Sequence, residues 1–319
     1  MRFFGTMRQK TVSLLHPKGN SGKRIERNDF TFSTFVTNFV CSTNYRKTTM
    51  NKLFDITGRT VVMTGATGVL GSCISKYLAS EGAIMIVMGR NREHGEALAK
   101  EITDAGGQAL FLACDVLDRP SLEKCRDEIL NRYGRIDVLI NAAGGNMPGA
   151  TIPTDKTFFD MSTDDFKKVV DLNLHGTVIP TQVFAEDMAK RGNGVIVNFS
   201  SESALRPLTR VVGYTSAKAA VQQFTKYMAV EMATKFGEGI RVNAIAPGFF
   251  LTEQNRTLLT NPDGSLTARG NAIVAHTPFG RFGTPDELCG TIHYLISDAS
   301  KFVSGTVAVV DGAFDCFCL

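Results

Sequence analysis

The sequence predicts an α/β fold, a doubly wound parallel sheet of about seven strands flanked by helices in a single domain. Two observations carry this prediction. From residue 59 onward, short apolar runs alternate with longer stretches of helical periodicity, the pattern of a parallel sheet whose connections are helices. The apolar runs are nearly continuous, as in strands that are buried on both faces. Together they predict a fold of the Rossmann type.

The elements follow in order. Strands are expected over residues 60–63, 83–88, 108–113, 136–140 and 195–199. The expected helices are one that opens at the glycine-rich run and ends at residue 78, two over 91–105 and 119–133, one long helix over 163–190, and one over 212–236. Because ligands bind at the carboxyl ends of the strands in such sheets, we expect the functional site there.

A glycine-rich turn, TGATGVLG, follows the first strand and opens the first helix. Such a turn lets backbone amides approach a pyrophosphate at the positive end of a helix. Glycines that merely cap a helix are the alternative, but the order of strand, turn and helix favours a dinucleotide site. Contacts are expected from Gly65, Thr67, Gly68, Val69, Leu70 and Gly71.

The end of the second strand indicates which dinucleotide is bound. An NAD site usually carries an acidic residue there, for the ribose hydroxyls. This chain has Gly-Arg-Asn-Arg at 89–92, so no carboxylate repels a 2′-phosphate, and Arg90 can bind one. NADP(H) is therefore favoured, with NAD(H) possible; the alternative is that Arg90 only faces solvent.

Tyr214 and Lys218 are four residues apart, so on a helix both side chains lie on one face. Free tyrosine has a pKa of about 10, and a neighbouring ammonium lowers that pKa toward the range useful for proton transfer. Ser201 follows the expected strand 195–199, with its hydroxyl at the strand end. The alternative is that the two residues form a chance pair on an ordinary core helix. Motifs elsewhere in the chain are needed to distinguish these two interpretations.

Residues 1–49 differ from the remainder. They carry nine Lys or Arg against two acidic residues, whereas the rest of the chain carries 26 against 29. The net charge of +4 is thus a property of this extension and gives no reason to expect a nucleic-acid partner. A transit peptide, a disordered arm and a translation start at Met50 stay open as interpretations. We expect the domain to span 50–319.

The seven cysteines and five histidines form no cluster with zinc-ligand spacing, so we expect no metal. Free thiols indicate a reducing compartment, and we expect a cytoplasmic protein. No run approaches the 18 or so apolar residues that a membrane helix needs, so no membrane partner is expected.

Taken together, these motifs resemble the short-chain dehydrogenase/reductase family over roughly residues 55–314. The matching positions are TGATGVLG, the turn at Asp115, NAAG at 141–144, Asn173 in DLNLHG, Ser201, Tyr214 with Lys218, and Pro247-Gly248. Ser201 lies thirteen residues before Tyr214, the spacing usual in that family, which selects it over Ser200. One departure is Val69, which stands where the family usually has its middle glycine.

The resemblance implies an NAD(P)-dependent oxidoreductase. Tyr214 would transfer the proton, Ser201 would polarise the substrate oxygen, and Lys218 would lower the phenol pKa and hold the nicotinamide ribose. Asn173 would hold a water that links Lys218 to solvent. Further cofactor contacts are implied at Asp115, Val116, Asn141, Ala142, Gly144, Pro247 and Gly248.

Three loops are expected to determine the substrate: 145–162, 205–211 and 249–283. The last is about 35 residues long, and loops of this length are usually lids or binding loops. It is rich in Thr, Asn, Gln and Arg, which suit several hydroxyls and one carboxylate. Arg206 or Arg256 is expected to bind the carboxylate, with Asn146 as a further contact; a solvated surface loop is the alternative.

The segments APGFFLTEQNRTLL and HTPFGRFGTPDEL in these loops resemble a narrower group within the family, the D-mannonate oxidoreductases or fructuronate reductases of the short-chain type. That implies a sugar-acid substrate and interconversion of D-fructuronate and D-mannonate. Alternatives are a reductase of another sugar keto-acid or of a 3-oxoacyl thioester, and a non-catalytic dinucleotide sensor. The intact set of Ser201, Tyr214, Lys218 and Asn173 argues against a sensor.

The family resemblance also implies a homo-oligomer, a tetramer or a dimer. The helices expected over 163–190 and 212–236 have apolar residues on more than one side, consistent with subunit contacts. Examples are Val169, Val170, Phe184, Val230 and Met232. The alternative is that these residues belong to the core.

Overall fold

The computed structural model describes residues 52–318, so the expectations for residues 1–49 lie outside the described residues. Its centre is one parallel sheet of seven strands in the order β3-β2-β1-β4-β5-β6-β7. The strands are β1 Thr60–Thr64, β2 Ile84–Gly89, β3 Gln108–Ala113, β4 Val138–Asn141, β5 Gly194–Phe199, β6 Ile240–Pro247 and β7 Val307–Val310. The order reverses between β1 and β4, where a doubly wound sheet opens a crevice for ligands.

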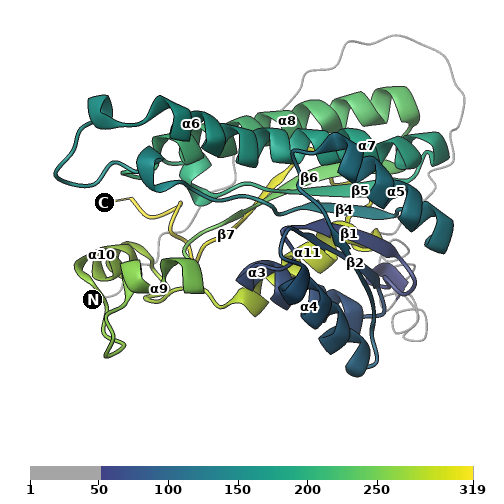
Figure 1. Ribbon diagram of the computed structural model, residues 1–319, viewed down its shortest axis with the longest axis horizontal. Coiled ribbons are helices and arrows are strands. Elements are labelled where there is room, and N and C mark those ends of the chain that lie inside the picture. The colour runs from purple at the N-terminus through teal and green to yellow at the C-terminus, as the bar shows by residue number, and fades with distance from the viewer. Residues whose placement is uncertain (1–51, 319) are drawn as a thin grey trace, which may run out of the picture. The chain divides into compact units, whose positions relative to one another are not determined.

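Helices cover both faces of the sheet (Figure 1). One face packs against α3 Val69–Ser80, α4 Arg92–Asp104 and α11 Cys289–Ile296. The other packs against α5 Arg119–Tyr133, α7 Gly176–Arg191 and α8 Val212–Phe236. Two apolar cores result, one on each side of the sheet, whose central strands β1, β4, β5 and β6 consist of buried residues. The predicted doubly wound α/β fold is confirmed.

The long helix expected over 163–190 is present as one unbroken helical run, but a π-helical turn interrupts its α-helical pattern. The structure has α6 Thr163–Val170, a π-helical turn over Asp171–His175, and then α7. At the centre of the turn, the side-chain amide of Asn173 donates to the Val169 carbonyl (2.8 Å) and to the Gly145 carbonyl (2.7 Å). A side-chain amide that bonds to nearby backbone competes with the regular helical pattern, and such π turns often mark functional positions.

The segment 249–283 is also more ordered than the long loop that we expected. It contains two helices, α9 Glu253–Leu259 and α10 Ala268–His276. Thr252 and Asn255 form a capping box at the start of α9, and the Thr267 hydroxyl accepts from the Gly270 N–H at the start of α10. These caps satisfy amides at the starts of the two helices that would otherwise be unpaired. We call α9 and α10 the helical cap.

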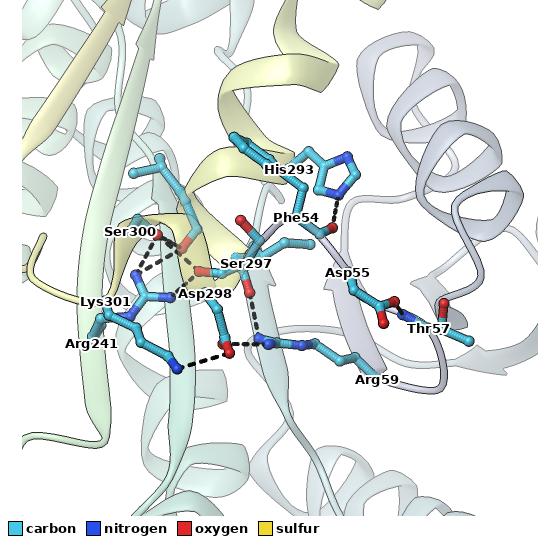
Figure 2. A network of polar contacts seen from close by, with 12 residues as sticks. Phe54, Asp55, Thr57, Arg59, Arg241, His293, Ser297, Asp298, Ser300 and Lys301 are labelled. Atoms are coloured by element: carbon cyan, nitrogen blue, oxygen red, sulfur yellow. Dashed lines mark hydrogen bonds and ion pairs between the residues drawn. The ribbon is translucent and has the colours of Figure 1, made fainter. Parts of the chain in front are cut away.

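A polar network lies at the amino-terminal ends of the strands, on the side of the sheet remote from the strands' carboxyl ends (Figure 2). Arg241, near the start of β6 and only 6% exposed, donates to the carbonyls of Leu295 (2.9 Å) and Ser297 (3.0 Å) and to the Ser300 hydroxyl (2.8 Å). Arg59, just before β1, binds the Ile296 carbonyl and Asp298 at 2.7 and 2.6 Å. This network ties two strands to the end of α11.

The residues that we considered for subunit contacts differ in how deeply they are buried. Val169 and Phe184 are fully buried and Met232 is 6% exposed, so these three belong to the core of the subunit. Val170 is half-buried. Val230 is 64% exposed and lies on α8 near Tyr227, which is 63% exposed. Of the five, Val230 therefore best retains the exposed apolar character that an interface between subunits needs.

Candidate active site

A cleft of about 840 Å³ lies at the carboxyl ends of the strands. Its size falls in the range of cofactor and small-molecule sites. Most of the predicted site residues line it, namely Gly65, Thr67, Gly68, Val69, Leu70, Gly71, Arg90, Asp115, Val116, Ala142, Gly144, Asn146, Ser201, Tyr214, Lys218, Pro247 and Gly248. Asn141, Asn173, Arg206 and Arg256 are not among the residues that line it.

The glycine-rich turn has the geometry of a phosphate cradle. Gly65 has φ +67°, and a Cβ there would come within 2.7 Å of the Ala142 backbone. Gly68 caps α3 without any side-chain hydrogen bond to the helix. The first amides of α3 therefore have no side-chain cap, and the first turn has no acidic residue. Free amides at the positive end of a helix fit the pyrophosphate of a dinucleotide.

The adenosine end of the cleft lies where β2 and β3 end. Arg90 is exposed and lines the cleft, as do His94, Cys114, Asp115 and Val116. Asp115 accepts from the Leu117 N–H at 2.9 Å, which fixes the turn after β3. Arg90 is thus placed where a ribose phosphate could be reached, and no acidic residue stands at the end of β2.

Asn141 does not point into the cleft as we expected. It is 1% exposed, and its amide nitrogen donates to Thr181 (3.0 Å) and Asn198 (2.9 Å). Asn198 in turn donates to Thr225 on α8 at 2.9 Å. The Asn141 amide nitrogen therefore joins β4 to α7 and β5 beneath the site, whereas its Oδ1 is buried without a partner among the described residues.

Three side chains meet where β5 ends and α8 begins. The Ser201 hydroxyl, 8% exposed, lies within hydrogen-bond reach of the Tyr214 phenol. The Lys218 ammonium lies 5.6 Å from the centre of the Tyr214 ring and donates to the Phe199 carbonyl at 2.7 Å. Ser200 instead bonds to the Lys218 backbone at 3.2 Å, which supports the choice of Ser201.

Burial determines the proton affinities of this group. It lowers the pKa of Lys218 to about 8, because charge is disfavoured away from water. Burial also raises the pKa of Tyr214, while the hydrogen bond with Ser201 acts in the opposite direction. The expected lowering of the tyrosine pKa by Lys218 is therefore not what the structure shows. Desolvation of the phenol outweighs the opposing hydrogen bond with Ser201.

Asn173 is fully buried behind the group of Ser201, Tyr214 and Lys218. Its Oδ1 accepts from the Gly145 N–H at 3.2 Å. Gly144 separates Asn173 from Lys218, since a Cβ on Gly144 would lie 2.6 Å from Asn173 Oδ1 and 3.1 Å from Lys218 Nζ. The π turn thus places Asn173 beside Lys218 rather than at the cleft wall.

Of the three predicted substrate contacts, one lines the cleft and two do not. Asn146 lines the cleft; its amide nitrogen donates to Thr151 at 2.8 Å, and its Oδ1 is buried without a partner among the described residues. Arg206 binds the Asp315 carboxylate at 2.9 Å and carbonyls of the C-terminal segment, so it anchors that segment instead of a substrate. Arg256, on α9, does not line the cleft.

Sequence reasoning missed several residues that line the cleft, and three of them carry polar side chains of interest for the chemistry. Arg269, on α10, has a buried Nε with no partner among the described residues. Ser203 donates to the Ser201 oxygen from both its N–H (3.2 Å) and its hydroxyl (3.1 Å). Glu202 is a carboxyl that is 1% exposed. Glu202 and Ser203 could have been found from their proximity to Ser201, whereas no spacing in the sequence distinguishes Arg269.

Within residues 52–318, no group of three or more His, Cys, Asp or Glu side chains could hold a metal ion. Nor is any helix in this range long and apolar enough to cross a membrane.

Comparisons with known proteins agree with this geometry. Residues 59–263 match the family model described as short chain dehydrogenase. The chain is 44% identical over 269 residues to an uncharacterized oxidoreductase, UxuB, of Bacillus subtilis, covering 82% of this chain and 96% of the relative. It is 33% identical over 261 residues to D-threitol dehydrogenase of Mycolicibacterium smegmatis, covering 82% and 94%.

Two solved structures are also similar. One is a candidate D-mannonate oxidoreductase of Haemophilus influenza with bound NAD, with 39% identity, a TM-score of 0.78 and coverage of 84% of this chain and 99% of that chain. The other is a gluconate 5-dehydrogenase of Burkholderia cenocepacia in complex with NADP and tartrate, with 32% identity, a TM-score of 0.75 and coverage of 84% and 100%.

The parallel sheet, the glycine-rich turn at α3 and the meeting of Ser201, Tyr214 and Lys218 agree with these matches. The chain belongs to the short-chain dehydrogenase family, and it is an NAD(P)-dependent oxidoreductase that acts on CH–OH groups.

Proposed function

We propose that the protein reduces a keto-uronate to an aldonic acid, D-fructuronate to D-mannonate, and catalyses the reverse oxidation. The observation that carries this proposal is Arg269, which extends from the helical cap to the cleft with a buried Nε that has no partner among the described residues. A guanidinium recognises a carboxylate through two parallel hydrogen bonds. Arg210 lies close enough to lower the pKa of Arg269 further, so positive charge concentrates here.

The other groups at the cleft suit a polyhydroxy substrate. Asn146 has a buried oxygen that the described residues leave unpaired, and Thr252 and Asn255 line the cleft from the start of α9. These side chains can form hydrogen bonds with hydroxyls along a sugar chain. An apolar acyl chain would leave the Asn146 oxygen unpaired, at a cost of about 1–3 kcal/mol. This composition favours a sugar acid over a 3-oxoacyl thioester.

A reduced nicotinamide, when bound, supplies the hydride. Tyr214 then donates its phenolic proton to the substrate oxygen, and Ser201 donates a hydrogen bond to the same oxygen. Ser203 assists because its hydroxyl donates to Ser201 Oγ, which leaves the Ser201 proton for the substrate. Lys218 holds the cofactor ribose and replenishes the proton of Tyr214, and Asn173 supports this relay from behind Lys218.

We assign NADP(H) as the favoured cofactor on the basis of Arg90 and the lack of an acidic residue at the end of β2. Relatives support both choices, since one similar structure holds NAD and another holds NADP. The substrate assignment has support of the same kind, because the names of these two structures refer to D-mannonate and gluconate enzymes.

Two arginines of the helical cap provide a matched test. Arg269→Met should lower kcat/KM for D-fructuronate by about 100-fold or more, mainly through KM, because a charge-assisted bidentate contact is lost. Arg256→Met, on the neighbouring helix, should leave kcat/KM within about threefold. If the two variants behave alike, Arg269 does not bind the carboxylate. If the wild-type protein reduces an acetoacetyl thioester and not D-fructuronate, the sugar-acid assignment is wrong.

A further inference from the structure

The chain after β7 ends in a C-terminal segment, residues 311–318, whose path is fixed by a tight turn. Gly312 and Ala313 have φ +66° and +71°, so the backbone is in the left-handed region at both positions. The Asp311 carboxylate accepts from the Ala313 N–H at 2.8 Å. Beyond the turn, Phe314 is only 6% exposed. The end of the chain is therefore tied down, which terminal residues without such contacts are not.

The C-terminal segment is attached to the helical cap through His276, the last residue of α10. The centre of the His276 ring lies 4.7 Å from that of Phe314 and 5.3 Å from that of Phe317, and both pairs are edge-on. Ring pairs at this spacing and angle are favourable. The Phe279 N–H, just beyond α10, also donates to the Gly312 carbonyl at 3.3 Å. The end of α10 is thus held by the C-terminal segment.

Arg206 attaches the same segment to the turn that follows Ser201. Its guanidinium donates to the Asp315 carboxylate at 2.9 Å and to the Phe317 carbonyl at 3.3 Å. Its backbone N–H donates at 3.1 Å to the carbonyl of Glu202, the first residue after Ser201. The C-terminal segment therefore links the end of α10 to the turn that carries the Ser201 hydroxyl.

The attachment at His276 bears on Arg269, because both side chains lie on one face of α10. The two residues are seven apart in the sequence, which is almost two helical turns and about 10 Å along the helix axis. Residues at this spacing have nearly the same angular position on a helix. Contacts that fix His276 thus fix the rotation of α10 about its axis, and with it the direction in which Arg269 extends to the cleft.

We infer that the C-terminal segment positions Arg269 at the cleft, with Phe314 and Arg206 as the positioning residues. The inference rests on the proposed function, because Arg269 affects the reaction only if it binds the substrate carboxylate. The competing explanation is that the segment contributes to the stability of the whole domain and to nothing at the cleft.

The kinetic test uses the full chain with D-fructuronate and NADPH. Phe314→Ala removes a ring that contacts His276 and should raise KM by about 10-fold or more, with kcat within about threefold of wild type. Arg206→Met, which releases the segment from the turn after Ser201, should raise KM in the same way. Phe314→Tyr keeps the ring, and Phe302→Ala makes the alanine substitution at a fully exposed side chain; both should retain the wild-type KM.

A double variant shows whether the effect passes through Arg269. When Arg269→Met has already removed the guanidinium, Phe314→Ala should raise KM by less than about twofold more, because residues that act through one contact are not additive. A loss in the double variant equal to the product of the two single losses overturns the inference, and so does an unchanged KM in Phe314→Ala.

Hydrogen exchange gives a readout that needs no turnover. In Phe314→Ala, the amides of α10 should exchange about 10-fold faster or more, while those of α3 keep their wild-type rates. Unchanged exchange in α10, or an equal increase in α3 and α10, overturns the inference. Faster exchange confined to the helical cap, in a protein whose wild type does not reduce D-fructuronate, overturns only the sugar-acid assignment.

Discussion

At the scale of single residues, the site combines groups that spacing reveals with groups that only the fold brings in. Tyr214 and Lys218 could be predicted because one helical turn fixes their separation. Ser201 followed from its place after a buried strand together with the thirteen-residue spacing to Tyr214, which the family resemblance supplied. Arg269 could not be predicted, because its position depends on where α10 packs, and nothing local in the sequence encodes that. Arg206 was a wrong choice for the same reason, since Asp315, 109 residues away, holds its guanidinium.

Tyr214→Phe tests the proton transfer directly. Loss of the phenolic proton should lower kcat by about 100-fold or more, the usual contribution of a general acid. NADPH binding, followed by quenching of reduced-cofactor fluorescence, should change by no more than about threefold. A variant that keeps wild-type turnover would show that another group supplies the proton.

Glu202 should also make stability depend on pH. Its pKa rises from an ordinary 4.5 to about 7 on folding, so the folded state holds the proton more tightly than the unfolded chain. Its contribution is therefore fully favourable below about pH 4.5 and is lost as the pH rises through about 7. The shift corresponds to roughly 3 kcal/mol.

Glu202→Gln, which cannot ionise, provides the comparison. Urea unfolding of both proteins at pH 5 and pH 8 should show the variant gaining stability relative to wild type at the higher pH, by about 2–3 kcal/mol. Parallel changes in the two proteins would mean that Glu202 titrates as it does in the unfolded chain.

At the scale of elements, regular strands and helices could be predicted and interruptions could not. The apolar runs gave strands β1 to β5 to within two residues, because burial on both faces leaves a plain pattern. The π turn at Asn173 escaped prediction, since it depends on side-chain bonds to the loop at Gly145. The two helices of the helical cap could not be predicted either, because such short helices depend on capping contacts more than on apolar periodicity.

The network at the base of the sheet supports a prediction about elements. Arg241→Met should lower the free energy of unfolding by about 3 kcal/mol, because three buried acceptors at and just after the end of α11 each lose a charged donor. The network lies at the ends of the strands remote from the cleft, so kcat/KM of the folded variant should stay within about twofold. Urea unfolding and steady-state assays measure both quantities; a large loss of activity at full stability would contradict this separation.

At the scale of the whole molecule, different parts of the fold determine where ligands bind, which reaction occurs and which substrate is selected. The doubly wound sheet, predicted from the sequence and confirmed, fixes where ligands bind. The glycine-rich turn and the group around Tyr214 make the site suitable for hydride transfer. The helical cap supplies Arg269, and through it the proposed selection of a sugar acid. The extension at 1–49 and the homo-oligomer stay predictions.

The central claim is that the protein reduces a keto-uronate, and one assay tests it most directly. Purified protein is mixed with D-fructuronate and NADPH, the loss of reduced-cofactor absorbance is followed, and the product is identified by chromatography. The account predicts saturable turnover, with kcat/KM above about 10⁴ M⁻¹s⁻¹, D-mannonate as the product and slower reaction with NADH. No turnover of D-fructuronate with either cofactor, by a protein that still binds NADPH, would contradict the claim.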